Sequence, residues 1–454
     1  MKRRLVLPVI LFLNACVPVT PTAIPTRANI SDSSLPPMKF FGPATPSPIQ
    51  RSNADIARDF LDLSFKLESG RELPVLTRFE GPITLHVMGN VPPSLEPDLR
   101  RLLTRLRTEA RIDVTPTASD DAAITIQAVT RTQIRSVLPQ AACFVAPNVS
   151  SLSEYRSARR QPRTNWTLLE TRTRIAIFIP SDSSPQEVRD CLHEELAQAL
   201  GPLNDLYRLP DTVFNDDNVH TVLTSFDMLI LRITYSSDLG SGMSREQVAA
   251  RLPRILARLN PAGEQRGASV VSETPQDWSR AILEAHSPGT SRASRERAAE
   301  TAIRIATDLG WTDHRRAFAH YVMGRLLQST NTEAAQSQFL SADAFYARSY
   351  ETQLHRAFVA TQLAAYAIAS NDPDKALRLI DPHIDAVTRA ENASLLATLL
   401  MLKAEALELA GRTSEAGTVR LDSLGWARYG FGSDWAVRAR LREIAALNPR
   451  KTAS

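Results

Sequence analysis

The sequence predicts two folded regions, an α+β region over residues 51–262 and an all-α region of helical repeats over residues 263–450. Runs with strand periodicity alternate with amphipathic helical runs in the first region. The second region has long helical runs separated by short breaks, and no run typical of a strand. A length of 454 residues, 43% of them hydrophobic, is sufficient for two or three domains with their own cores.

The first sixteen residues have the layout of an export signal, with three basic residues before an apolar run over residues 5–13. That run is about half of the ~20 apolar residues that cross a bilayer, so it predicts a removable segment. The sequence "LNAC" that ends at Cys16 resembles the lipobox of bacterial lipoproteins, which implies lipidation of Cys16 after cleavage. An ordinary signal peptide with an unrelated cysteine is the alternative.

Residues 17–50 are rich in Pro, Ser and Thr and show no apolar periodicity. This composition is typical of a semi-extended linker. We expect it to join the lipid to the first domain.

Strands and helices follow in an order that predicts the α+β class. Residues 94–110 form an amphipathic pattern with leucines at helical spacing. A helix that starts near Asn218 or Asp217 is expected to carry Phe226 on its buried face. Short β-rich or apolar runs predict strands at residues 83–89, 122–129 and 174–180.

The best-delimited helix is predicted over residues 185–200. Ser184 is its expected N-cap, with Glu187 three residues later as the partner in a capping box. Pro185 suits the first helical position, and Gly201 ends the helix.

Helix pairs are predicted throughout the C-terminal region, because its helical runs are joined by short breaks. Ala335, Ala376 and Ala416 occupy equivalent positions, 41 and 40 residues apart. The segments "NDPDKALRLI" and "GRTSEA" resemble tetratricopeptide (TPR) repeats, although the usual period is ~34 residues. We therefore expect a TPR-like domain, with a closed helical bundle as the alternative.

The helix at residues 185–200 contains a near-match to a zinc-protease motif. In the pattern H-E-x-x-H two histidines one helical turn apart hold zinc, and the glutamate polarises water. His193 and Glu194 begin such a pattern, but Ala197 stands where the second histidine is needed.

Read one residue later, the helix resembles the H-E-x-x-H-x-L-G motif of matrixin-like zincins. The ligand positions then fall on Glu194, Gln198 and Asn204, the catalytic glutamate on Glu195, and the turning glycine on Gly201. None of the three ligand positions carries the imidazole nitrogen that suits zinc. The resemblance therefore implies a zincin-like domain with no bound metal.

Three segments, "EELAQALGPLND", "VFND" and "FDMLILRITYSSDLGSGMS", resemble the hallmarks of DUF2927, a bacterial family of exported proteins. They lie at residues 194–205, 213–216 and 226–244. No biochemical activity is established for that family, so the resemblance implies a zincin-like fold and no reaction.

Glu195 is the candidate catalytic residue. Its helical face also carries Cys191 and Ala199, so its carboxylate should be partly buried, with a raised pKa that suits a general acid or base. A structural role, bonded to the backbone or to Asn204, is the preferred alternative. Oxygen ligation of Ca²⁺ or Mg²⁺ by Glu194, Gln198, Asn204 and Asp205 is a further alternative.

The cysteine count supports export. Once Cys16 is lipidated, Cys143 and Cys191 remain as a pair, which predicts a disulfide in an oxidising compartment. Two buried free thiols are the alternative. The net charge of +4 comes from dispersed residues, so no nucleic-acid partner is expected.

These observations predict a lipid-anchored periplasmic protein that binds or scaffolds an envelope protein or peptide and needs no cofactor. Val17 after Cys16 slightly favours the outer membrane over the inner. One alternative function is a hydrolase of peptide or cell-wall material that uses Glu195. Another is a purely structural lipoprotein.

Overall fold

The computed structural model describes residues 35–269 and 271–452. The predicted signal peptide, Cys16 and most of the predicted linker lie outside the described residues. Among the helices in these two ranges, none combines the length and the apolar composition that a bilayer span requires.

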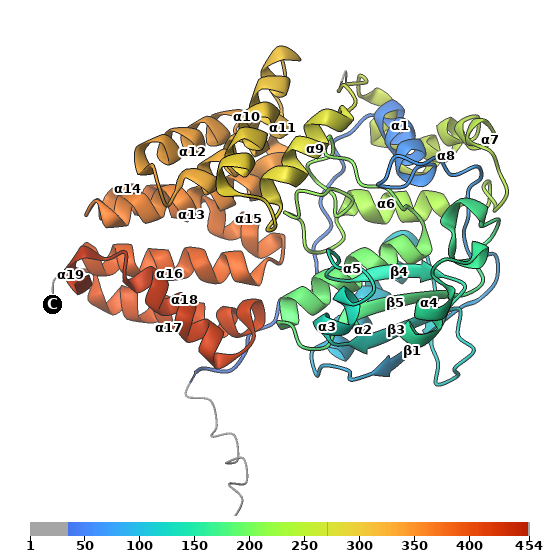
Figure 1. The fold of residues 1–454 in the computed structure, drawn as a ribbon, viewed down its shortest axis with the longest axis horizontal. Coiled ribbons are helices and arrows are strands. Elements are labelled where there is room, and N and C mark those ends of the chain that lie inside the picture. Colours follow the sequence, from blue (N-terminus) through green and yellow to red (C-terminus); the bar gives the residue numbers. More distant parts are fainter. Residues whose placement is uncertain (1–34, 270, 453–454) are drawn as a thin grey trace, which may run out of the picture. The chain divides into compact units, whose positions relative to one another are not determined.

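One mixed sheet forms the centre of the N-terminal region, with strand order β2-β1-β3-β5-β4 (Figure 1). Strands β1, β2, β3 and β5 are parallel, and the edge strand β4 runs antiparallel to β5. The strands are β1 (Ile83–Gly89), β2 (Val114–Pro116), β3 (Ile124–Val129), β4 (Phe144–Pro147) and β5 (Ile175–Pro180). The predicted α+β region is therefore an α/β region with a mainly parallel sheet.

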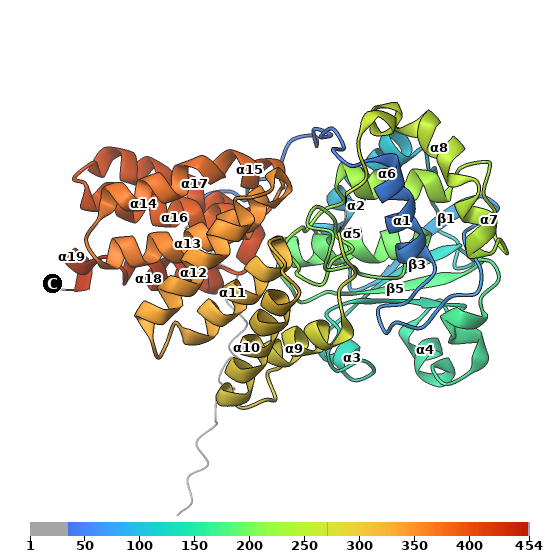
Figure 2. The same cartoon turned by 90° about the horizontal axis from the view of Figure 1, so that it is seen from above.

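Helices cover both faces of this sheet, which explains why every residue of β5 is apolar and buried. Ile175, Ile177 and Ile179 point into the larger core, on the side of α2, α5 and α6 (Figure 2). Ala176 and Phe178 point into a smaller core on the side of α3 and α4. The helices of this region are α1 (Asn53–Ser64), α2 (Leu95–Arg105), α3 (Arg131–Arg135), α4 (Leu152–Ala158), α5 (Pro185–Leu200), α6 (Ser225–Thr234), α7 (Arg245–Ala249) and α8 (Leu252–Leu259).

In the described residues of the C-terminal region every regular element is a helix, and neighbouring helices pack as pairs (Figure 1). Ala335, Ala376 and Ala416 are all buried, as expected where two helices approach closely. The predicted helix pairs are thus confirmed. The helices are α9 (Gln276–His286), α10 (Arg292–Asp308), α11 (His314–Leu327), α12 (Thr332–Tyr346), α13 (Gln353–Ala369), α14 (Pro373–Ile380), α15 (Ile384–Arg389), α16 (Ala393–Leu409), α17 (Thr413–Phe431), α18 (Asp434–Ala445) and α19 (Pro449–Thr452).

Cys143 and Cys191 form the predicted disulfide, with their Cα atoms 5.9 Å apart. Cys143 immediately precedes the edge strand β4, and Cys191 lies in α5. The bond therefore ties the edge of the sheet to the helix that carries the zincin-like motif.

The described residues from 36 onward form one compact unit, in which the N-terminal half of α5 contacts the C-terminal helices. Gln186 accepts a hydrogen bond from the backbone N–H of Ser394 at 2.8 Å. Arg189 is 1% exposed; it pairs with Glu391 and lies over the ring of Tyr429. These buried polar contacts fix the motif helix against the helical region.

Residues 36–50, which the composition assigns to the linker, have no helix or strand but pack along this unit. The Phe41 ring stacks on Trp426 with 4.4 Å between centroids. The backbone N–H of Ser47 donates to Ser225 Oγ at 2.8 Å. The end of the predicted linker therefore belongs to the folded unit.

Candidate functional site

The motif helix α5 begins and ends at defined contacts. Ser184 Oγ accepts from the N–H of Glu187 as predicted, but the Glu187 carboxylate pairs with Arg131 instead of completing the capping box. The Arg172 guanidinium, 3% exposed, donates to the carbonyls of Gln198 and Gly201 at the other end. Because those carbonyls carry the negative end of the helix dipole, the cation stabilises that terminus.

Gly201 lets the chain turn sharply after α5. A Cβ atom at this position would lie 3.2 Å from Thr234 Oγ1 on α6, which is tighter than most real contacts. The chain then returns past the end of α5, which brings Asp205 and Asp216 near Glu194 and Glu195.

The three positions that the motif resemblance assigns to zinc ligands have separate roles in the structure. Asn204 donates to the backbone carbonyl of Asp62 at 2.9 Å, so it fixes the turn after α5. The Gln198 side chain hydrogen-bonds to the carboxylate of Glu68. Glu194 is half-buried beside Glu195. The structure thus brings Glu194 and Gln198 together but directs Asn204 away.

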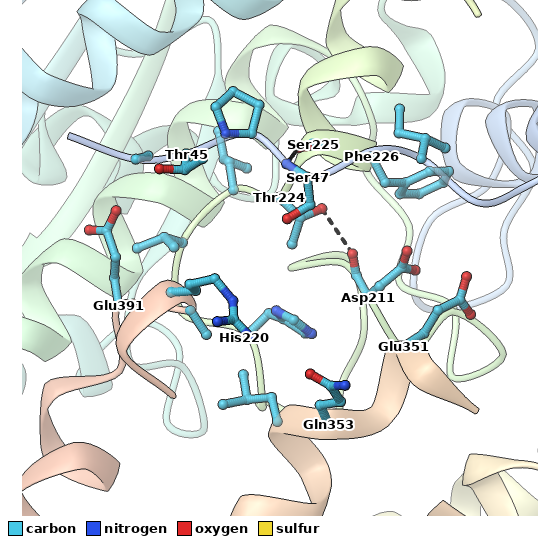
Figure 3. A pocket seen from close by; sticks show the side chains of 18 of the residues that line it. Thr45, Ser47, Asp211, His220, Thr224, Ser225, Phe226, Glu351, Gln353 and Glu391 are labelled. Carbon is cyan, nitrogen blue, oxygen red and sulfur yellow. Dashed lines mark hydrogen bonds between the residues drawn. The ribbon is translucent and has the colours of Figure 1, made fainter. Parts of the chain in front are cut away.

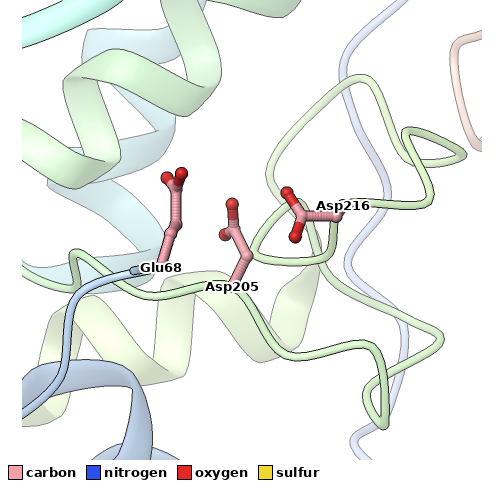
Figure 4. A group of neighbouring side chains, drawn as sticks. All are labelled: Glu68, Asp205 and Asp216. Carbon is pink, nitrogen blue, oxygen red and sulfur yellow. The ribbon is translucent and has the colours of Figure 1, made fainter. Parts of the chain in front are cut away.

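Five acidic side chains gather at this end of α5, and we call them the carboxylate cluster. Its outer members are Glu68, Asp205 and Asp216, which offer oxygen atoms within 4.8 Å of one another (Figure 4). Its inner members, Glu194 and Glu195, belong to the motif helix. Figure 4 shows the Asp216 carboxyl pointing toward Asp205.

The cluster runs from solvent into the interior. Glu68 and Asp216 are exposed and Asp205 is half-buried, whereas Glu195 is only 4% exposed. Burial and the neighbouring Glu194 and Glu68 raise the pKa of Glu195 well above its usual range. Desolvation, followed by Glu68 and Asp216, likewise raises the pKa of Asp205. The burial predicted for Glu195 is therefore confirmed, and its role in catalysis stays a prediction.

Glu194 is expected to make the stability of the protein depend on pH. Burial, then Glu68 and Asp216, raise its pKa from 4.5 to about 7. Since folding raises the pKa of Glu194, the contribution of its protonated carboxyl to stability is complete below about pH 4.5. This contribution is lost as the pH rises through about 7. In a buffer with a chelator, the free energy of unfolding of Glu194→Gln should exceed that of the wild type by roughly 1–2 kcal/mol at about pH 8. At about pH 5 the two proteins should have nearly the same free energy of unfolding.

Urea unfolding at the two pH values measures this difference. Glu300→Gln, at an exposed position on α10, is the matched control and should not change the pH dependence. An equal effect of Glu194→Gln at both pH values would show that its carboxyl does not titrate in this range.

Two other polar residues of the motif region are structural. His193 is 5% exposed, and its Nδ1 accepts from the backbone N–H of Leu223 at 3.1 Å. Asp227 is fully buried and accepts from Thr212 and from the backbone N–H of Thr224. The helix that contains Asp227 is capped by Thr224, and not by Asn218 or Asp217 as the sequence suggested.

A cavity of about 460 Å³ lies next to the cluster, and we call it the aromatic cavity. Asp216 belongs to both the cavity lining and the cluster. Asp217, beside it, accepts from His355 Nε2 at 2.9 Å. The aromatic side chains of the lining are Tyr207, Phe318, Tyr321, Tyr346 and Phe358.

The field in this cavity is negative. Burial raises the pKa of Tyr207, and the carboxylates of Asp216, Asp217 and Asp205 raise it further. Burial and then Asp217 raise the pKa of Tyr346 in the same direction. An aromatic lining with this charge suits a cationic group.

A second cavity, of about 210 Å³, is separate from the cluster. Figure 3 shows Thr45 and Ser47 on one side of it and Gln353, on α13, on the other. His220 and Glu391 also line it. It includes no member of the carboxylate cluster.

Sequence reasoning did not predict Glu68 or Asp216 as site residues. Glu68 lies in the loop after α1, more than a hundred residues before α5, so no local spacing points to it. Asp216 belongs to the "VFND" segment that the resemblance to DUF2927 had already singled out. The resemblance of that segment to the family was therefore the sequence signal that could have identified Asp216.

Comparison with known proteins supplies no function. Neither a curated protein nor a solved structure matches this chain. Residues 53–254 match the family described as "Protein of unknown function (DUF2927)", so the resemblance read from the sequence is confirmed over that part of the chain.

Proposed function

We propose that this chain is a lipid-anchored binding protein of the cell envelope, whose zincin-like domain holds a ligand without hydrolysing it. The ligand we propose is a peptide with a basic side chain, bound in the aromatic cavity. The observation that carries the proposal is the position of this negatively charged cavity beside the altered motif helix.

The zincin-like assignment is supported by the order of elements around α5. The motif helix directly follows the last parallel strand, β5, and is joined by a disulfide to the segment before the antiparallel edge strand β4. The turn at Gly201 then returns the chain to the end of α5. These features accord with the motif, although the matched family is described only as one of unknown function.

The absence of peptide hydrolysis is proposed from the ligand positions. Glu194, Gln198 and Asn204 provide carboxylate or amide oxygens where zincins have imidazoles. Asn204 is also committed to the carbonyl of Asp62.

Charge and shape support the proposed ligand. A lysine or arginine side chain has an apolar stem that can contact Phe318 and Tyr321, and a cationic end that Asp216 attracts. Leu283 lies at the same cavity and is 59% exposed, so substitutions there alter the entrance without disturbing the core.

Leu283→Lys is expected to weaken binding of a lysine-rich pentapeptide by roughly fivefold, because the added cation repels the ligand. Fluorescence anisotropy with the labelled peptide measures this, and a glutamate-rich peptide of equal length should bind much more weakly. The matched control is Leu340→Lys, since Leu340 is 55% exposed on α12 and does not line the cavity. Equal binding of both peptides, or none of either, would contradict the proposal.

A hydrolase that uses Glu195 is the second candidate, favoured by the buried Oε2 of Glu195, which has no hydrogen-bond partner. A carboxyl with a raised pKa in a shielded position is suited to proton transfer. Mass spectrometry of the same peptide mixtures separates the two functions. Peptide cleavage that Glu195→Gln abolishes would replace the binding function with the hydrolase.

A further inference from the structure

We propose that the carboxylate cluster is a site for a hard divalent cation, with Ca²⁺ as the ion it suits best and Glu68, Asp205 and Asp216 as its outer ligands. This site is distinct from the three zincin ligand positions, and it does not depend on the peptide function proposed above.

The donor atoms fit such an ion. Carboxylate oxygens of Glu68, Asp205 and Asp216 lie within 4.8 Å of one another, which is close enough for one cation to contact all three. Ca²⁺ accepts six to eight oxygen ligands at about 2.3–2.6 Å in flexible geometry, whereas zinc prefers nitrogen and sulfur. Since Glu68 and Asp216 are exposed, water can complete the coordination.

Unpartnered buried oxygens give a second and independent indication. Glu195 Oε2 and Asp205 Oδ1 are both inaccessible to solvent and accept no hydrogen bond. Glu195 lies close enough to raise the pKa of Asp205, whose carboxyl stands between those of Glu68 and Asp216 (Figure 4). Buried polar atoms without a partner are rare in folded proteins and require an explanation such as an ion.

The chain pairs several of its other buried acidic residues with basic ones. Arg208 pairs with Asp59 and Asp62, each at 2.8 Å. Arg189 pairs with Glu391 in the same way.

The carboxylate cluster is different. Within residues 35–269 and 271–452, no lysine, arginine or histidine pairs with any of its five members. Five carboxylates at such short range repel one another unless they bind protons or a cation. A divalent ion would supply the missing positive charge.

Calorimetric titration of the chelator-treated full chain with calcium chloride tests the site. We expect one ion per chain, with a dissociation constant on the order of 10⁻⁵–10⁻³ M. Binding should tighten as the pH rises, because the carboxyls must lose their protons first. Asp205→Asn should weaken binding by at least about tenfold.

Asp121→Asn, at an exposed carboxylate in the loop before β3, is the matched control and should bind calcium like wild type. Circular dichroism verifies that Asp205→Asn is folded, and the wild-type titration stands independently of that variant. No binding by wild type at millimolar calcium, or equal binding by Asp205→Asn, would overturn the proposal. Asp216 lines both the cavity and the cluster, so peptide binding is measured with chelator present and calcium binding without peptide; each site then succeeds or fails separately.

Discussion

Replacing Arg189 by alanine is expected to lower the free energy of unfolding by about 3–5 kcal/mol. The reason is that removal of Arg189 leaves the buried carboxylate of Glu391 without its buried cationic partner. Arg189 is 1% exposed, and its Nη1 lies 3.3 Å from Glu391 Oε2. Its guanidinium also lies 5.1 Å from the centroid of the Tyr429 ring. The substitution therefore removes an ion pair and a cation–π contact, and leaves a cavity where α5 meets the C-terminal helices.

Urea unfolding followed by circular dichroism measures this loss. Arg101 also pairs with Glu391, at 2.9 Å. Because Arg101 is partly exposed, it should offset only part of the charge that Glu391 retains when Arg189 is removed. Arg107→Ala is the matched control, since its pair with Asp113 is 62% and 67% exposed and should contribute less than about 1 kcal/mol. A similar small loss in both variants would mean that α5 and the C-terminal helices are not held together by Arg189.

Reduction of the Cys143–Cys191 disulfide is expected to cost about 4 kcal/mol of unfolding free energy, because the bond closes a loop of 48 residues in the unfolded chain. The loss should be measurable as a lower urea midpoint in the presence of reductant. Since Cys191 lies in α5, reduction should also loosen the motif helix relative to strand β4.

The double variant Cys143→Ala/Cys191→Ala should have a low midpoint that reductant does not change further. It therefore separates loss of the bond from other effects of reductant. If the wild-type midpoint stays constant after both thiols have been shown to be free, the disulfide does not stabilise the fold.

The parts of the fold with strong local patterns could be predicted from the sequence. Ser184, Pro185 and Gly201 delimit α5 through capping chemistry, which depends only on neighbouring residues. Helical pairing followed from the short breaks between helical runs, and Ala335, Ala376 and Ala416 recur where helices approach.

Features that depend on tertiary contacts were not predicted. Strand β4 has only four residues and lies in a loop-like stretch, so its pairing with β5 has no clear sequence signal. The start of α6 was misplaced because Asp217 is an equally good N-cap residue locally; in the fold its side chain accepts from His355.

The candidate site was predicted in part, for the same reason. The zincin-like motif assigned Glu194, Glu195 and Gln198 to one site, and all three lie on α5. Periodicity carries no information about Glu68 and Asp216, which reach the cluster from distant loops. The sequence therefore predicted the motif positions on α5, but not the oxygen atoms that gather beside them.

The most direct measurement of the central claim is anomalous diffraction from crystals of the chain grown with manganese, which replaces calcium at oxygen sites. We expect one strong peak bounded by the carboxylates of Glu68, Asp205 and Asp216. A peak held instead by Glu194, Gln198 and Asn204, or no peak at the cluster, would contradict it.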